Sequence, residues 1–190
     1  FTGNNEMVIA ITNRTGLMKR YAQNNFSGNP TPDFPLPKET ERYTYGENVR
    51  SYQPTDGVVI CENKLYNINT AAFVQMEYED KSKWATHSKM MYSPALKAVV
   101  KGEKGGALGI YDATTGKLRE SIDYKTDEYK SDQPLWVGAS ENGKLVGLIG
   151  NGQLYVTDLS TKQNIFSLKS QWGTNGYITT AAFIDNDKLL

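Results

Sequence analysis

The 190-residue sequence predicts an all-β protein in which a unit of four antiparallel strands is repeated. Two observations support this prediction. A pattern of strand, polar turn and strand recurs at intervals of roughly 45 residues, and the segments that carry it alternate apolar and polar residues with the period of a β-strand. No segment combines sustained helical periodicity with capping residues. We therefore expect almost no helix.

The clearest repeats are residues 107–118 and residues 153–161, which align when one is shifted by 46 positions. Leucine falls on leucine, and Asp112 falls on Asp158. An aspartate that closes a strand can accept a hydrogen bond from the backbone two residues further on, and Gly116 can supply a positive φ angle. Each copy is thus predicted to be a hairpin.

Two further copies precede this pair. Residues 64–70 match with an offset of 43 and place Asn69 at the position of the aspartate. Residues 8–16 match as well, with Thr15-Gly16 falling on Thr115-Gly116. Four copies predict four hairpins along the chain.

Two more short strands are expected before each hairpin, and residues 135–168 show them best. The strands 135–139 and 144–149 flank Asn142-Gly143, a favoured two-residue hairpin turn. The pattern begins again at 177–183 and continues into 189–190. We therefore expect the end of one four-stranded unit, three nearly whole units and the start of another.

One region interrupts the repeat. Residues 23–53 are rich in proline and asparagine, with prolines at 30, 32, 35 and 37. Proline lacks the backbone donor that a central strand or a helix requires. We expect an extended surface loop inserted between the first and second copies, and loops of this length are either functional or disordered.

The segment Tyr111-Asp112-Ala113-Thr114-Thr115-Gly116-Lys117-Leu118 resembles the repeats of quinoprotein-like β-propellers, and its spacing resembles WD40-type repeats. The resemblance implies a β-propeller with about four blades of four antiparallel strands, so that residues 1–190 form part of a larger propeller. The rest would come from the parent chain or from a second copy. Tyr111-Asp112 replaces the Trp-Asp pair of WD40 repeats, and no tryptophan follows Leu118 where the quinoprotein repeat has one.

The charges are balanced, with 21 Lys and Arg against 21 Asp and Glu. No basic cluster of the kind that phosphate binding needs is present, so we expect no nucleic-acid partner. No run approaches the roughly 18 apolar residues of a membrane helix. We therefore expect no membrane contact by this segment.

The sequence predicts no catalytic, cofactor-binding or metal-binding residues. His87 is the single histidine, which disfavours triads and zinc sites with several histidine ligands. The acidic run Glu77-Tyr78-Glu79-Asp80 lacks the spacing of a calcium-binding loop and is interpreted as solvated. An enzyme is thus not the favoured interpretation, and no cofactor is expected.

Three tryptophans, Trp84, Trp136 and Trp172, recur near the starts of the predicted units. They are the candidate partner-binding residues, because interfaces favour tryptophan. The alternative is that they pack between blades.

These observations favour a non-enzymatic protein-interaction or scaffolding module with protein partners. One alternative is an extracytoplasmic sensor or ligand-binding domain, which the glycosylation sequons at Asn13 and Asn25 suggest. Another is a fragment of a quinoprotein-like enzyme. The sequence predicts no particular compartment.

Overall fold

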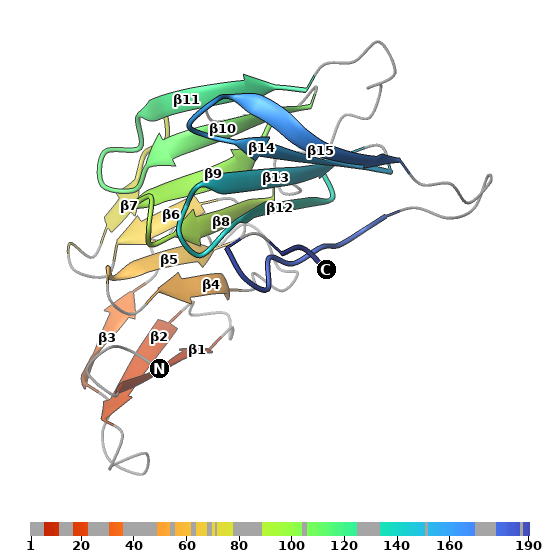
Figure 1. The fold of residues 1–190 in the computed structure, drawn as a ribbon. Helices are drawn as coiled ribbons and strands as arrows, with labels where there is room; N and C mark the ends of the chain where they lie inside the picture. The colour runs from red at the N-terminus through yellow and green to blue at the C-terminus, as the bar shows by residue number, and fades with distance from the viewer. Residues whose placement is uncertain are drawn as a thin grey trace. The chain divides into compact units, whose positions relative to one another are not determined.

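A computed structural model describes most of the strands of the chain (Figure 1). The described residues are 6–11, 17–22, 31–35, 49–53, 56–61, 64–67, 70, 72–77, 89–103, 106–124, 134–150, 152–169, 178–186 and 188–190. Within these ranges the secondary structure consists of strands and turns and contains no helix. The all-β prediction is confirmed. The chain divides into two compact units, Phe1–Gln75 and Met76–Leu190.

The first unit contains two antiparallel sheets. The first sheet has the order β1-β2-β3, from β1 (Glu6–Ile11), β2 (Leu17–Ala22) and β3 (Thr31–Pro35). The second has the order β4-β5-β6-β7, from β4 (Val49–Gln53), β5 (Val58–Cys61), β6 (Lys64–Asn67) and β7 (Ala72–Val74). The hairpin expected at residues 8–16 is formed by β1 and β2, in which Val8 lies opposite Arg20.

The loop predicted at 23–53 contains two strands, β3 and β4. Both are edge strands of their sheets. Proline is tolerated at an edge, where a missing N–H can face away from the neighbouring strand, and Pro32 and Pro35 both lie in β3. The prolines exclude a central strand, as expected, but the expectation of an irregular loop over the whole range was wrong.

The second unit contains two four-stranded antiparallel sheets, each with its strands in chain order. One comprises β8 (Met90–Ser93), β9 (Ala98–Gly102), β10 (Ala107–Asp112) and β11 (Leu118–Asp123). The other comprises β12 (Trp136–Ala139), β13 (Leu145–Gly150), β14 (Gln153–Asp158) and β15 (Gln163–Lys169). Together with β4–β7 they confirm the predicted four-stranded unit.

A short hairpin follows in residues 178–190, where the sequence predicted that a new unit starts. Phe183 and Leu189 form an antiparallel bridge. The backbone groups of Ala182 and Leu190 exchange hydrogen bonds of 3.0 and 2.9 Å. The hairpin thus occupies the first and second strand positions of a unit.

The turn at Asn142-Gly143 is longer than predicted. Ser140 and Leu145 are joined by a backbone hydrogen bond of 2.9 Å, so that four residues lie between them. Gly143 has a φ of 70°, whereas Asn142 is not among the described non-glycine residues with positive φ. A two-residue turn of the primed type I would need positive φ at both central positions. The Asn142-Gly143 pair therefore predicted the position of the turn correctly, but the type of turn wrongly.

The polar turns after the third strands share one design. The Asp112 carboxylate accepts hydrogen bonds from the backbone of Thr114 and Thr115, at 2.9 and 2.7 Å. The Asp158 carboxylate accepts bonds from Ser160 and Thr161 in the same way, at 2.8 and 3.2 Å.

In the unit β4–β7 this role falls to Asn67, whose side chain accepts a bond from the backbone of Thr70 at 3.3 Å. The predicted equivalent, Asn69, lies outside the described residues, and the bond is made by a residue two positions earlier. The shift arises because β6 is a short strand that ends at Asn67, before the aligned position is reached.

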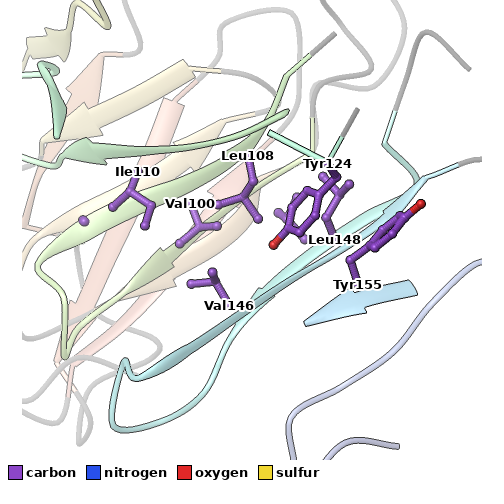
Figure 2. Packing of buried hydrophobic residues seen from close by; sticks show 9 residues of the cluster. Val100, Leu108, Ile110, Tyr124, Val146, Leu148 and Tyr155 are labelled. Atoms are coloured by element: carbon purple, nitrogen blue, oxygen red, sulfur yellow. The ribbon is translucent and has the colours of Figure 1, made fainter. Parts of the chain in front are cut away.

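The two sheets of the second unit share a hydrophobic core (Figure 2). Its buried members are Ala98, Val100, Leu108, Ile110, Tyr124, Val137, Val146, Leu148 and Tyr155. The rings of Tyr124 and Tyr155 stack with centroids 5.0 Å apart. The Tyr124 hydroxyl lies 2.7 Å from the Thr157 hydroxyl, which satisfies both buried polar groups, and burial raises the pKa of Tyr124 to about 12. The core therefore contains side chains from both sheets, β8–β11 and β12–β15.

Candidate partner-binding surface

Of the three tryptophans proposed for partner binding, Trp136 lies within the described residues, whereas Trp84 and Trp172 lie outside them, as does His87. Trp136 is half-buried, and its ring covers Gly138 and Gly147 so closely that a methyl group on either glycine would overlap the indole. Its ring centroid lies 6.1 Å from that of Phe183. The described contacts of Trp136 are thus packing contacts within its own chain.

Trp136 belongs to a second hydrophobic cluster, on the face of the sheet β12–β15 that points away from the shared core. The buried centre of this cluster is Ile149, Leu154 and Val156. The segment 178–190 covers it with side chains that include Ile178, Phe183 and Leu189. The C-terminal hairpin therefore protects the part of this face that lies over the inner strands.

The outer part of the same face stays open to solvent on β15. Phe166 lies opposite Val156 and Leu168 lies opposite Leu154 in the register of β14 and β15. Directly opposed residues point to the same face of a sheet. Phe166 and Leu168 therefore continue the covered apolar face, yet they are 46% and 44% exposed. We call these two side chains the open face.

Ser167 lies on the other face of β15, because it lies opposite Tyr155 of the shared core. Ile165 is 54% exposed and lies at the register shift between Asn164 and Phe166, where it has no Cα partner in β14. All seven residues of β15 are exposed, although it is a strand with three large apolar side chains. A flat, exposed apolar edge strand is a template for pairing with another strand unless something covers it.

The open face was not predicted from the sequence, although a comparison of the repeats distinguishes β15 from β11. With the offset of 46, the open-face residues Phe166 and Leu168 align with Glu120 and Ile122 of β11. Ile122 packs against the shared core, and Leu168 has no such cover. The first of these positions is therefore charged in β11 and apolar in β15. This difference indicates that the two strands have different surroundings.

Electrostatics at β15 are weak and of one sign. Lys162 and Lys169 stand at its two ends, and no acidic residue occurs from 159 to 169. The Lys162 ammonium lies 3.0 Å from a carboxylate oxygen of Glu120, with its side chain 71% exposed. An ion pair this exposed contributes little to stability. A partner that binds β15 would therefore do so mainly through apolar contacts and not through ion pairs.

A polar cluster of a different kind holds the turn between β10 and β11. The Arg119 guanidinium bonds the Asp112 carboxylate, and it also donates a hydrogen bond of 2.7 Å to the carbonyl of Leu96. The Glu77 carboxylate accepts a bond of 2.8 Å from the backbone of Leu118. Arg119, together with the backbone donors of the turn, holds the pKa of Asp112 well below its usual range. Every one of these contacts ties a turn in place, which is a structural role.

The Asp112 turn gives a testable pH dependence. Because the pKa of Asp112 is lowered on folding, its contribution to stability is complete above the usual value of 3.8 and is lost as the pH falls toward the folded value. We expect Asp112→Asn to lower the free energy of unfolding by about 1 kcal/mol at pH 7. It should also flatten the curve of stability against pH below pH 4 in urea titrations. Arg119→Gln should flatten the same curve, and an unchanged slope in both variants would contradict the assignment.

The most buried charged group is formed by Lys101, Glu103 and Tyr111. The Lys101 ammonium lies 3.1 Å from one Glu103 oxygen, and the two side chains are 4% and 12% exposed. The Tyr111 hydroxyl donates to the other Glu103 oxygen at 2.5 Å, and the Lys101 ammonium lies 5.7 Å from the centre of the Tyr111 ring. Such a group neutralises a buried ammonium and fixes the turn between β9 and β10.

The described ranges hold neither a cluster of metal ligands nor a membrane-spanning helix. No three His, Cys, Asp or Glu side chains within them are grouped so that they could hold a metal ion. No helix within them is long and apolar enough to cross a membrane.

No family model matches the chain, and no curated protein matches it. Among solved structures, the chain is similar to the Cps50 (Swd1) β-propeller domain of Myceliophteria thermophila, with 14% sequence identity and a TM-score of 0.39. The similarity covers 45% of this chain, and the chain spans 26% of the length of that structure.

Proposed function

We propose that this chain is a non-enzymatic protein-interaction module whose open face binds a partner that supplies a β-strand. The observation that carries the proposal is the exposure of Phe166 and Leu168 on a face that the chain itself covers elsewhere. Their cross-strand neighbours Val156 and Leu154 are each 4% exposed. Phe166 and Leu168 thus extend an apolar face whose inner part the chain itself already covers.

The hairpin that covers the inner part of the face indicates what kind of partner would cover the outer part. The hairpin in residues 178–190 covers the inner part of the face with apolar side chains on an extended backbone. A partner strand with alternating apolar residues would extend this cover over Phe166 and Leu168. Burial of one such side chain contributes about 1.5 to 3 kcal/mol. Two of them together can supply the centre of a binding site.

The test compares substitutions on the two faces of β15. We expect Phe166→Asp and Leu168→Asp each to weaken partner binding at least tenfold, because a charge would be desolvated in an apolar contact. The matched control is Ser167→Asp, at an exposed position that lies opposite Tyr155 on the other face of the same strand, which should bind like the wild type. Thermal unfolding must show that all three variants remain folded.

The measurement has two stages. Proteins that the wild-type chain captures and the Phe166→Asp chain does not are identified, purified and titrated against each variant by calorimetry. The proposal requires at least one purified protein whose affinity depends on residues 166 and 168 and not on residue 167. Equal affinities for all variants, or no protein that separates them, would overturn it.

A further inference from the structure

We infer that the turn between β14 and β15 binds the guanidinium group of an arginine from another polypeptide, where the preceding sheet holds an arginine of its own. This site goes beyond the proposed function and does not depend on it, because it lies at the beginning of β15 and not on the open face. The sheets β8–β11 and β12–β15 share a strand order and differ here in one residue.

The fourth strand of each sheet contains one extra residue that forms a β-bulge. The register of β10 with β11 skips Arg119, and the register of β14 with β15 skips Ile165. Both shifts lie the same distance before the aspartate that closes the third strand, which is Asp112 in one sheet and Asp158 in the other. The repeat offset of 46 aligns the same two bulge residues. Ile165 therefore occupies the place of Arg119.

Arg119 binds a set of oxygen acceptors around the turn. Its guanidinium donates to Oδ2 of Asp112 from Nε at 3.2 Å and also from Nη2. It donates further to the carbonyls of Leu96 and Lys97, at 2.7 and 3.3 Å. The other carboxylate oxygen, Oδ1, accepts from the backbone of the turn. A planar group with several donors can satisfy acceptors arranged in this way.

Two of these three acceptors recur in the sheet β12–β15. Oδ1 of Asp158 again accepts from the backbone of the turn, whereas its Oδ2 has no hydrogen bond or ion pair with the described chain. The Lys144 carbonyl corresponds to that of Lys97, because each accepts from the N–H that follows the aspartate, at 2.9 and 3.3 Å. The backbone differs at the third acceptor, where Gly143 with a φ of 70° replaces Leu96. The donor is missing, and most of its binding site is present.

The site is negatively charged and accessible. Hydrogen bonds from the hydroxyl and backbone of Ser160 and from the backbone of Thr161 lower the pKa of Asp158, and the nearby charge of Lys144 lowers it further. No ion pair joins Lys144 to this carboxylate among the residues that the structure describes. Ile165 cannot donate a hydrogen bond and is 54% exposed. A charged side chain from outside can therefore reach the free oxygen.

The arrangement favours a guanidinium group over other cations. Calcium takes about six to eight oxygen ligands, and one carboxylate with one carbonyl is too few. An ammonium is a compact, strongly hydrated point charge, whereas a guanidinium is planar and more weakly hydrated. A guanidinium can donate to Asp158 and to the Lys144 carbonyl together, as Arg119 does to the equivalent pair.

Titration with capped amino acids tests the site. In NMR spectra of the full chain, N-acetylarginine amide should cause saturable shifts of the amides of Ser160 and Thr161, whose N–H groups bond the carboxylate. N-acetyllysine amide should bind at least about fivefold more weakly. The amides of Thr114 and Thr115 are the internal control and should not shift, because Arg119 fills their site.

Exchange of the two bulge residues gives the matched variants. Ile165→Arg should fill the site and abolish the response of amides 160 and 161. Arg119→Ile should open the equivalent site, so that amides 114 and 115 respond to N-acetylarginine amide.

A third variant removes the charge and keeps the turn. Asp158→Asn retains an oxygen for the backbone donors, as Asn67 accepts from Thr70 in the sheet β4–β7. It should weaken the binding of N-acetylarginine amide at least about tenfold, because the free oxygen loses its charge. If Arg119→Ile fails to fold, Ile165→Arg and Asp158→Asn decide.

Three results would overturn the inference. These are a wild type whose amides 160 and 161 show no saturable response, equal affinity for the arginine and lysine derivatives, or a response that Asp158→Asn leaves unchanged. The open face is tested separately, because substitutions at positions 166 and 168 keep the acceptors of this turn.

Discussion

Replacement of Leu148 by alanine is expected to lower the free energy of unfolding by about 2 to 5 kcal/mol. Leu148 is completely buried in the centre of β13 and packs in the core that joins the two sheets of the second unit, as Figure 2 shows. Sheets on both sides prevent the site from collapsing around the shorter side chain. The cost therefore includes both the lost burial and the cavity that remains.

Urea unfolding followed by tryptophan fluorescence and by circular dichroism measures this effect. The matched control is Ile165→Ala, which truncates a side chain that is 54% exposed on β15. We expect the control to change the free energy of unfolding by less than about 1 kcal/mol. Similar losses for the two variants would show that the two sheets do not share a core in solution.

Glu103→Gln is expected to be the second most damaging of the substitutions considered, with a loss of about 3 kcal/mol. The carboxylate accepts a hydrogen bond from Tyr111 on one oxygen and pairs with Lys101 on the other. An amide has the same shape but a single oxygen, so that it cannot accept from both groups, and it provides no charge opposite the buried ammonium. The penalty comes from the ammonium that keeps its charge in a poorly solvated place.

A double-mutant cycle separates this penalty from a simple loss of packing. Lys101→Met removes the ammonium and keeps most of the side-chain volume. If the pair acts as described, Lys101→Met/Glu103→Gln should cost at least about 1 kcal/mol less than the sum of the two single variants. Additive losses would show that the two charges do not interact in the folded state.

The strands that the sequence predicted well share a simple physical origin. In β10 and β14 an apolar strand ends at an aspartate whose carboxylate binds the turn that follows. The geometry is local, so that a short stretch of sequence contains all of its causes. The same holds for the hairpin of β1 and β2, whose partners are only a few residues apart.

The features that the sequence missed depend on distant neighbours. The prolines of β3 exclude a central strand, but whether they lie in a loop or at a sheet edge depends on β2, which offers them a partner. Position 162 is another case: Lys162 has a φ of 58° where the preceding repeat has Gly116 with a φ of 71°. The N–H of Lys162 donates to the Asp158 carbonyl at 2.8 Å, as that of Gly116 does to the Asp112 carbonyl, so the turn keeps this conformation without glycine.

The extent of the open face could not be predicted from the sequence for the same reason. Phe166 and Leu168 are apolar residues of a strand, and strands of this composition are usually covered. That β15 is a fourth strand follows from the repeat. The extent to which the C-terminal hairpin covers its face follows only from the packing of Trp136 and Phe183 across the inner strands.

Site-specific photo-crosslinking tests the central claim most directly. A photoreactive phenylalanine analogue is placed at position 168 of the full chain, or at position 167 as the control on the opposite face. We expect a discrete crosslink from position 168 to a β-strand of another polypeptide, mapped by mass spectrometry, and little product from position 167. Equal crosslinking from both positions, or a product from position 168 that contains only residues 178–190 of the same chain, would contradict it.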